Sequence, residues 1–434
     1  NRWGYFPSAS AAWNISNEKF LSQNKVVSNL KLRASWGQTG NNRVSEYAYR
    51  TQMYATEGSE YPFDNSNTTG NLIVNLGNRN LKWETTTQWD AGVDLGLFHN
   101  RLTIAVDWYR KITSDLLLSA DIPPSSGFST NTMNIGKVRN QGWEFTLQTE
   151  NFNTKNFRWT TDFNIAFNRN RILGLVDGQN TLQSSVSWET RFNSQFPYIS
   201  QVGKPTGMMY GFIYDGTYKA EDFDDKGNLV SGVPSFKGNA MQPGDMKYRD
   251  MNGDGVIDDY DRCLIGQGDV PKIYYGFGAD LQMGNFSIGA LFSGTAKADR
   301  CLSGNAIHPF ADTSGYSNLY DNIGDRWSAD DPTNQDVFYP RLQYGATANE
   351  NNTKTSTWWQ KDVSFLRLKQ MTVAYNLPKA WLNKTFIKNA RIYVMGTNLL
   401  TFSKFKLWDP ELNTNNGTSY PNSRTYSIGV NVNF

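Results

Sequence analysis

One segment of the sequence has side chains whose types and spacing suit a hard divalent cation. Carboxylate and amide oxygens recur at alternate positions, and a glycine stands where a calcium loop of about 12 residues makes its sharp turn. The expected ligands are Asp250, Asn252, Asp254, the backbone carbonyl of Val256, Asp258 and Asp261, with Gly255 at the turn. The sequence therefore predicts a calcium site in residues 250–261.

The same segment has a second interpretation, which needs no ion. Its last position is Asp261, whereas a calcium loop usually ends in a glutamate, so this carboxylate has a shorter reach. The flanking residues do not have a helical pattern, and a turn rich in Asp, Asn and Gly forms without a metal. Calcium is the one cofactor that we expect, and a metal-free turn stays open as the alternative.

No other set of residues indicates chemistry. The two histidines, His99 and His308, and the two cysteines, Cys263 and Cys301, lie apart from any nucleophile motif. No glycine-rich loop follows a strand pattern and precedes a helix pattern, as a phosphate-binding loop does. We therefore expect no catalytic residues and no enzyme activity. The net charge of +2 gives no electrostatic case for nucleic acid as a partner.

The elements that must position these residues have a period of two. In residues 83–96 and 157–168, apolar side chains occupy the odd positions and polar side chains the even ones. Such alternation predicts β-strands with one apolar and one polar face. The other alternating stretches are 9–13, 30–36, 102–109, 143–148, 273–281, 286–292, 371–375, 392–395 and 426–434.

Strand length separates a membrane barrel from a soluble sandwich. Several of these strands run for about 11 to 15 residues, whereas sandwich strands average about 5 or 6. The polar faces are rich in Gly, Asn, Thr and Asp, which suits a wet lumen, and aromatic residues lie near the strand ends, as in interface girdles. No apolar run approaches the roughly 18 residues of a spanning helix. The predicted fold class is all-β, a transmembrane antiparallel β-barrel, with a soluble sandwich as the alternative.

The connections between strands differ in length in a regular way. The short ones are residues 97–100, 150–156, 283–285 and 377–389. We expect the short turns to face the periplasm and the long loops to face the outside of the cell, with a large extracellular insertion at about 169–270. That insertion contains one candidate strand, Met208–Tyr218, which either belongs to the insertion or crosses the membrane together with a partner strand that the pattern does not show. The chain therefore holds eleven or thirteen barrel strands.

Aromatic side chains are frequent in the long loops. Their flat rings can stack on sugars, or they can pack one loop on another. For any single residue of this set we favour packing. The side chains concerned are Tyr316, Tyr320, Trp327, Trp358 and Trp359.

A series of short motifs follows in a specific order along the chain. They lie at residues 29–37 (NLKLRASWG), 81–85 (LKWET), 94–102 (DLGLFHNRL), 210–216 (YGFIYDG), 244–255 (GDMKYRDMNGDG), 271–277 (PKIYYGF), 364–369 (SFLRLK), 393–399 (YVMGTNL) and 426–434 (YSIGVNVNF). Together they resemble the C-terminal portion of SusC-like (RagA-like) TonB-dependent outer-membrane transporters.

This resemblance implies that residues 1–434 are the C-terminal half of a barrel of roughly 22 strands in the outer membrane of a Gram-negative bacterium. It implies a plug domain and N-terminal strands outside this chain, a SusD-like surface lipoprotein as a lid, and energy from the TonB–ExbB–ExbD complex. Outer-membrane lipids would surround the barrel.

The implied activity is active import of a large nutrient, an oligosaccharide in the first place or a peptide. Two alternatives stay open. One is a surface glycan-binding or adhesive β-protein without transport, and the other is a siderophore or cobalamin receptor.

Overall fold

The computed structural model describes residues 3–434 except 45, 64–65, 129, 176–179, 185–197, 238–239, 305–306, 310–320, 344–350 and 384. The chain forms two compact units. Unit 1 holds residues 1–146, 168–181 and 201–206, and unit 2 holds residues 147–167, 182–200 and 207–434. Nearly all regular elements are strands. Among the described residues, no helix is long and apolar enough to cross a membrane.

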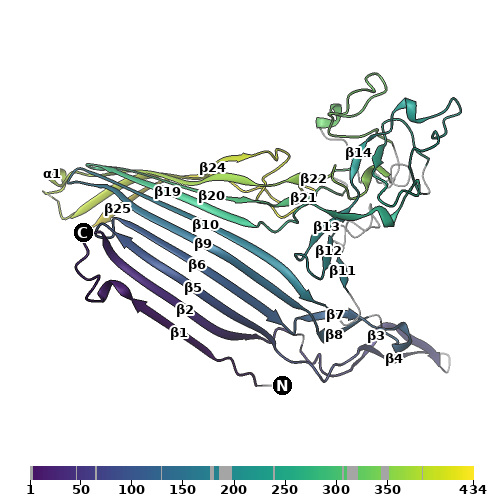
Figure 1. Ribbon diagram of the computed structural model, residues 1–434, viewed down its shortest axis with the longest axis horizontal. Coiled ribbons are helices and arrows are strands. Elements are labelled where there is room, and N and C mark those ends of the chain that lie inside the picture. Colours follow the sequence, from purple (N-terminus) through teal and green to yellow (C-terminus); the bar gives the residue numbers. More distant parts are fainter. Residues whose placement is uncertain are drawn as a thin grey trace. The chain divides into compact units, whose positions relative to one another are not determined.

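One sheet contains the strands that the alternating pattern predicts. It has eleven strands, which lie side by side in the order in which they occur along the chain (Figure 1). Each strand is hydrogen-bonded to its neighbours in that order. They are β1 (Ser8–Asn14), β2 (Val27–Asn41), β5 (Glu84–Leu97), β6 (Leu102–Ser114), β9 (Lys137–Asn153), β10 (Phe157–Gly174), β19 (Ile273–Met283), β20 (Phe286–Ala296), β23 (Phe365–Asn376), β24 (Asn389–Ser403) and β25 (Thr425–Asn433). Of the two strand counts that the sequence left open, the described residues give eleven.

The register of these strands places apolar side chains of one strand beside apolar side chains of the next. Trp159 pairs with Leu281, Leu281 with Ile288, and Ile288 with Val373, so apolar side chains form a continuous surface across four strands. Directly opposed residues of an antiparallel pair point to the same side of the sheet. The period of two along each strand therefore becomes one apolar and one polar face of the wall.

Tight turns connect the strands where short connections were predicted. Between β5 and β6, three consecutive residues, Phe98, His99 and Asn100, have positive φ angles of 54°, 60° and 61°. The Ser28 hydroxyl oxygen accepts the backbone N–H of His99 at 2.6 Å, which helps to hold this strained turn. Between β19 and β20, Gly284 has a φ of +56°, a conformation that L-residues rarely adopt.

Met208–Tyr218, which the sequence left open as a barrel strand or as part of the long insertion, does not join the main sheet. This stretch forms two short strands outside the main sheet, β13 (Met208–Gly211) and β14 (Tyr214–Thr217), which pair with β18 (Cys263–Ile265) and β16 (Met246–Tyr248). Phe212 lies between them, is fully buried, and stacks on Tyr248 with ring centroids 5.0 Å apart. Alternation here serves an apolar core in the loops, because one side of each short strand packs against it.

We call this cluster the loop core. It lies in unit 2 and draws its residues from the three long connections that follow β10, β20 and β24. Its buried members are Met209, Phe212, Tyr218, Phe236, Met241, Met246, Tyr248, Ile257, Ile265, Ala298, Cys301, Leu302, Ile307, Tyr339, Trp359, Val363 and Phe405. The connections are therefore folded structures with their own hydrophobic stabilisation.

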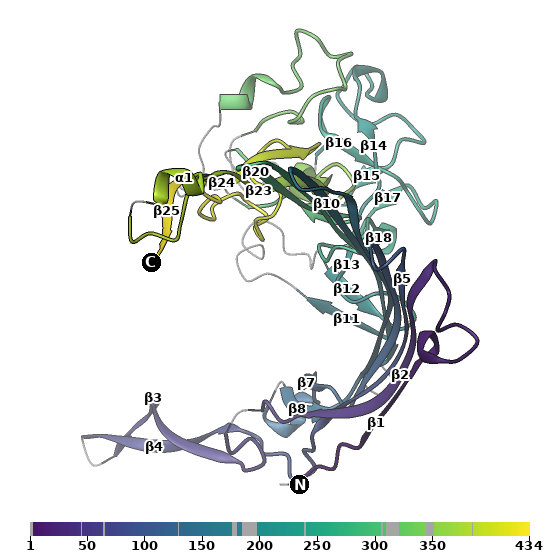
Figure 2. The same cartoon turned by 90° about the vertical axis from the view of Figure 1, so that its left-hand side faces the viewer.

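The remaining elements lie in the connections between the strands of the main sheet. Figure 2 shows β3 (Gln52–Phe63) and β4 (Ser66–Asn75) side by side as a hairpin, and β7 (Leu117–Asp121) and β8 (Thr130–Asn134) form another. The other strands are β11 (Thr181–Ser184), β12 (Tyr198–Gln201), β15 (Ser235–Phe236), β17 (Val256–Ile257), β21 (Asp299–Cys301) and β22 (Gln360–Asp362). The described helices are α1 (Lys379–Leu382) and the 3-10 turns Ile15–Asn17, Pro124–Ser126, Ala220–Asp222, Asp259–Asp261, Asp321–Gly324 and Asn351–Thr353.

Candidate functional site: a polar hollow in the strand wall

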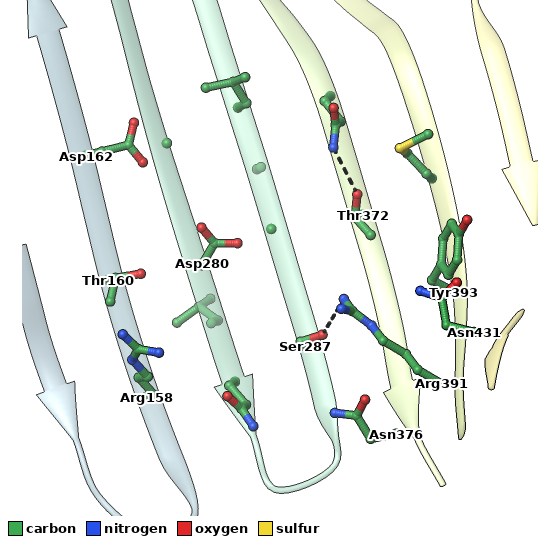
Figure 3. Close-up of a pocket in the computed structure, with 18 residues that line it drawn as sticks. Arg158, Thr160, Asp162, Asp280, Ser287, Thr372, Asn376, Arg391, Tyr393 and Asn431 are labelled. Carbon is green, nitrogen blue, oxygen red and sulfur yellow. Dashed lines mark hydrogen bonds between the residues drawn. The ribbon is translucent and has the colours of Figure 1, made fainter. Parts of the chain in front are cut away.

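The polar face of unit 2 contains a hollow of about 840 Å³. Side chains from six neighbouring strands, β10, β19, β20, β23, β24 and β25, line it, and Figure 3 shows them projecting from one face of the sheet. On β10 these are Arg158, Thr160 and Asp162, which occupy the even positions that the sequence assigned to the polar face. The sequence predicted this face but did not single out which of its residues gather.

Glycines on neighbouring strands give the carboxylates room in this wall. Asp162 lies directly opposite Gly278, and Asp280 lies directly opposite Gly289. A Cβ atom at either glycine would collide with the carboxylate of its partner. The two acidic side chains can therefore lie across the adjacent strand, because a glycine stands there.

The charges of the hollow are separated along the strands. Arg158 and Arg391 lie towards the short turns, and Asp280 and Asp162 lie further along the strands (Figure 3). Arg391 donates only one long hydrogen bond, from Nη2 to Ser287 Oγ at 3.4 Å, and Arg158 Nε is 3.6 Å from Glu150 Oε2. Neither Asp162 nor Asp280 makes a hydrogen bond or an ion pair with any residue that the structure describes.

On the polar face of unit 1, the charged side chains bond to one another and to neighbouring polar groups. Arg33 on β2 reaches two carboxylates, with Nη2 at 2.7 Å from Asp94 Oδ1 and Nη1 at 2.9 Å from Asp107 Oδ1. Asp90 accepts a hydrogen bond from the Ser35 hydroxyl at 3.1 Å. These side chains are paired within the wall, whereas the two carboxylates of the unit 2 hollow accept no hydrogen bond from the residues that the structure describes.

The predicted calcium loop lies between β16 and β18 of unit 2. Asp250 accepts the backbone N–H groups of Gly253 at 2.6 Å and Gly255 at 2.7 Å, and these contacts, that of Gly255 first, hold the pKa of Asp250 below its usual value. Asp261 accepts the N–H groups of Met251 and Asp258, both at 2.8 Å.

The other predicted ligands also bond within the loop. Asn252 Nδ2 donates to Asp254 Oδ2 at 3.0 Å, Asp254 Oδ1 accepts the N–H of Val256 at 2.8 Å, and Asp258 Oδ1 accepts the N–H of Tyr260 at 2.9 Å. In the described part of the chain, no group of three or more His, Cys, Asp or Glu side chains is gathered so as to hold a metal ion. The calcium site stays a prediction.

The aromatic residues of the long loops are mostly packing residues where the structure describes them. Trp359 and Trp327 are buried, and the indole N–H of Trp359 donates to the Asn352 carbonyl at 2.8 Å. Trp358 is half-buried and lies 4.6 Å from the ring of Tyr214. Tyr316 and Tyr320 lie outside the described residues. The three tryptophans hold loops together, so they give little support to a sugar-stacking surface.

His308 is a buried member of the same region, and His99 lies in the β5–β6 turn. The His308 ring meets Trp359 edge-on, with centroids 4.7 Å apart, and burial lowers the pKa of His308 to about 3.

The burial of His308 predicts that acid loosens the loop core. Its folded pKa lies below the usual 6.5, so stability is complete above pH 6.5 and falls as the pH drops towards 3. Between pH 6.5 and about pH 5 the loss is about 2 kcal/mol, because the unfolded chain takes up the proton more readily. Unfolding by urea at the two pH values, followed by tryptophan fluorescence, measures it. His308→Leu should remove most of the difference, and an unchanged pH dependence in that variant would contradict the assignment.

A wall of long antiparallel strands, with one apolar face and one polar face that carries charges, is typical of an outer-membrane β-barrel protein. The family described as TonB dependent receptor-like, beta-barrel matches residues 1–298. The chain belongs to this family of outer-membrane receptors.

Known relatives match this chain over its whole length. It is 33% identical to TonB-dependent receptor P3 of Formosa agariphila and 29% identical to TonB-dependent receptor SusC of Bacteroides thetaiotaomicron, covering 100% of this chain and 42% and 40% of those proteins. The solved RagAB peptide importer in its open-open state superposes with a TM-score of 0.78 at 26% identity, over 100% of this chain and 43% of that one. The chain thus spans about two-fifths of its relatives' length. The resemblance to SusC-like and RagA-like receptors, the all-β barrel fold and the outer-membrane location are confirmed.

Proposed function

We propose that this chain is the C-terminal half of the barrel of a TonB-dependent importer that carries a large nutrient, an oligosaccharide or a peptide, into the periplasm. A SusD-like surface lipoprotein would cover it, and the TonB–ExbB–ExbD complex would supply energy. The protein would act by binding and passage and would not be an enzyme.

The observation that carries the proposal is the wide polar hollow in the wall of unit 2. A barrel of this size encloses a lumen that admits cargo larger than ordinary porins pass. The hollow, about 840 Å³ in volume, presents two arginines and two aspartates on the polar face of the strands. The relatives support the same activity, since one is named SusC and another is a peptide importer.

The test is energised uptake by living cells. Cells that lack the gene, cells that carry it and cells depleted of the proton-motive force are given fluorescent peptides and oligosaccharides, and the label in the periplasm is measured. We expect accumulation only with the gene and the energy source together.

Other outcomes point to the two alternatives. Label that binds the surface without entering the periplasm would indicate a glycan-binding or adhesive protein. Gene-dependent uptake of iron chelates or cobalamin, without uptake of either polymer, would indicate a receptor for small chelates.

We also propose that residues 250–261 bind calcium, with Asp250, Asn252, Asp254, Val256, Asp258 and Asp261 as ligands. The support is the spacing of oxygen-bearing residues, together with positive φ angles of 79° and 81° at Gly253 and Gly255 that let the segment turn sharply. Calcium would require the carboxylates to exchange some backbone partners for the ion.

Calcium removal should loosen this segment before the rest of the protein. Clustered carboxylates repel one another without a cation, so a chelator should increase protease cleavage near Tyr260, which is 82% exposed. Terbium provides a second readout, since Tyr260 would sensitise its luminescence in the loop. Asp250→Asn with Asp254→Asn should abolish both effects. Equal cleavage with and without calcium, and no terbium signal, would reject the proposal.

A further inference from the structure

We propose that the apolar face of unit 1 binds a phosphorylated glycolipid of the outer leaflet, of the lipid A type. Arg110 of β6, Arg139 of β9 and Arg169 of β10 would hold its phosphate groups, and an apolar groove beside them would hold an acyl chain. The inference concerns the outside of the barrel, so it goes beyond the proposed import function and does not depend on the nutrient.

Arg110 lies on the face of the wall that we assign to lipid. It is directly opposite Trp89 of β5, and Trp89 is directly opposite Trp36 of β2. Directly opposed residues of antiparallel strands point to the same side of the sheet. The arginine therefore continues a row of tryptophans on the apolar face.

Arg139 and Arg169 lie on the same face of the next two strands. Each occupies an odd position, as Trp143 of β9 does, and successive side chains of a strand point to opposite faces. The even neighbours meet on the polar face, where Asn170 Nδ2 donates to Asn140 Oδ1 at 2.8 Å. The strands β6, β9 and β10 are neighbours in the sheet, so the strands that carry the three arginines span about 10 Å.

The arginines lie towards the strand ends that lead into long connections. β6 ends at Ser114, β9 begins at Lys137 and β10 ends at Gly174. Short turns face the periplasm in outer-membrane barrels, so these ends face the outer leaflet. Trp108 and Trp143 precede the arginines on the same face, as aromatic girdles do at the level of lipid headgroups.

The wall itself supplies no anion for these guanidinium groups. Arg110, Arg139 and Arg169 make no hydrogen bond or ion pair with any residue that the structure describes, and the Nε atoms of the first two are buried without a partner. In the described residues of β6, β9 and β10, no Asp or Glu lies on the apolar face. A phosphate accepts two parallel hydrogen bonds from a guanidinium, so it would satisfy these groups at the edge of the apolar layer.

The cluster is local, and its charge favours a lipid over a second receptor copy. In unit 2, the corresponding ends of β19 and β20 carry the uncharged pair Ile273 and Ala296 on the apolar face. Arginine is therefore not a general feature of these strand ends. A twofold contact of the unit 1 face with itself would bring like charges together, whereas an anionic lipid neutralises them.

An apolar groove of about 580 Å³ lies on the same face. Three directly opposed alanines, Ala11, Ala34 and Ala91, line it together with Trp108. Trp108 is two positions before Arg110 on β6, about 7 Å along the strand. An acyl chain in the groove would therefore have its headgroup beside the arginine.

The test uses the full-length receptor in detergent and three probes. These are lipid A with both phosphates, the same lipid A after removal of both phosphates, and inorganic phosphate. Native mass spectrometry over a concentration series measures each affinity. We expect the phosphorylated lipid to bind about tenfold more tightly than the dephosphorylated one, the order expected from three partly exposed charge pairs. Arg110→Gln, Arg139→Gln and Arg169→Gln together should remove that difference.

Two further variants separate the parts of the site. Lys111→Gln removes a cation from the opposite face of β6, where Lys111 lies over the Tyr109 ring, and should leave the preference for the phosphorylated lipid unchanged. Ala34→Leu narrows the groove, so it should weaken both lipids to the same degree and keep the preference. Heat-modifiable mobility shows whether each variant is folded.

Three outcomes would overturn the proposal. They are equal binding of the two lipids by the unaltered receptor, a preference that the triple variant retains, and displacement of the lipid by an equal concentration of inorganic phosphate, which would indicate a site for free anions. A receptor dimer that the triple variant loses, with lipid binding unchanged, would assign the arginines to a contact between receptor copies. The comparison of the two lipids on the unaltered receptor needs no variant, so it decides the proposal even when the triple variant does not fold.

Discussion

Replacing Phe212 by alanine is expected to destabilise the loop core by about 3–5 kcal/mol, the cost of removing a fully buried aromatic ring. The ring is 0% exposed, stacks on Tyr248 at 5.0 Å and meets Phe236 edge-on at 5.7 Å. Its loss leaves a cavity where two segments of the long loop meet. Urea unfolding monitored by the fluorescence of Trp359 and its neighbours, with limited proteolysis of the loops, measures the effect.

The same substitution at an exposed ring provides the control. Phe20 is 73% exposed, and Phe20→Ala should change stability by less than about 0.5 kcal/mol. The heat-modifiable mobility that reports a folded barrel should survive in both variants, since Phe212 lies outside the main sheet. A Phe212→Ala protein with protease-resistant loops would show that the loop core does not depend on this cluster.

Placing an arginine at Ile165 is expected to cost about 2–4 kcal/mol if the site lies near the middle of the bilayer. Ile165 occupies an odd position of β10, on the face where Phe277 and Phe292 of the next two strands stack at 4.5 Å. We assign that face to lipid, where a guanidinium loses its hydration. The fraction of folded receptor after refolding into lipid vesicles, measured across a urea series, gives the cost.

Asn164→Arg changes the adjacent residue on the opposite face. Asn164 pairs with Gly276 and belongs to the polar surface, so the added charge stays near water and should cost far less. Equal losses in the two variants would mean that the assignment of the faces to lipid and lumen is wrong.

The alternation of side chains was sufficient to locate the wall but not its full extent. The sequence indicated a strand at residues 30–36, and β2 runs from Val27 to Asn41. The extension, Gln38 to Asn41, is polar on both sides and pairs with three threonines and a glutamate of β5, from Thr87 to Glu84. Period two marks only the part of a strand that has an apolar side, because backbone pairing continues where both faces are wet.

The loop core could not be predicted from the sequence, because its residues come from three connections that lie far apart along the chain. Met208–Tyr218 alternates as a barrel strand does, and nothing local separates a face packed on lipid from one packed on Tyr248. One feature of the sequence did indicate that this stretch is not a barrel strand. The alternation of short turns and long loops requires barrel strands to come in pairs here, and the stretch had no partner strand.

Part of the hollow could have been predicted from the sequence. Met283 pairs with Phe286 across the Gly284 turn, which fixes the register of β19 and β20 and places Asp280 opposite Gly289. An acidic residue facing a glycine on a polar strand face is a readable signal. Its lack of a partner is not, because the sequence gives no measure of which side chains meet.

The dispersed origin of the loop core has a consequence for the time course of folding. Phe405 follows β24, and Met209 follows β10, so β19, β20, β23 and β24 separate two side chains that share one core. Joining such distant segments costs loop-closure entropy, and adjacent hairpins of the sheet lower that cost when they form first. The surface loops should therefore acquire protection from hydrogen exchange after the strands do, as the last slow phase of assembly.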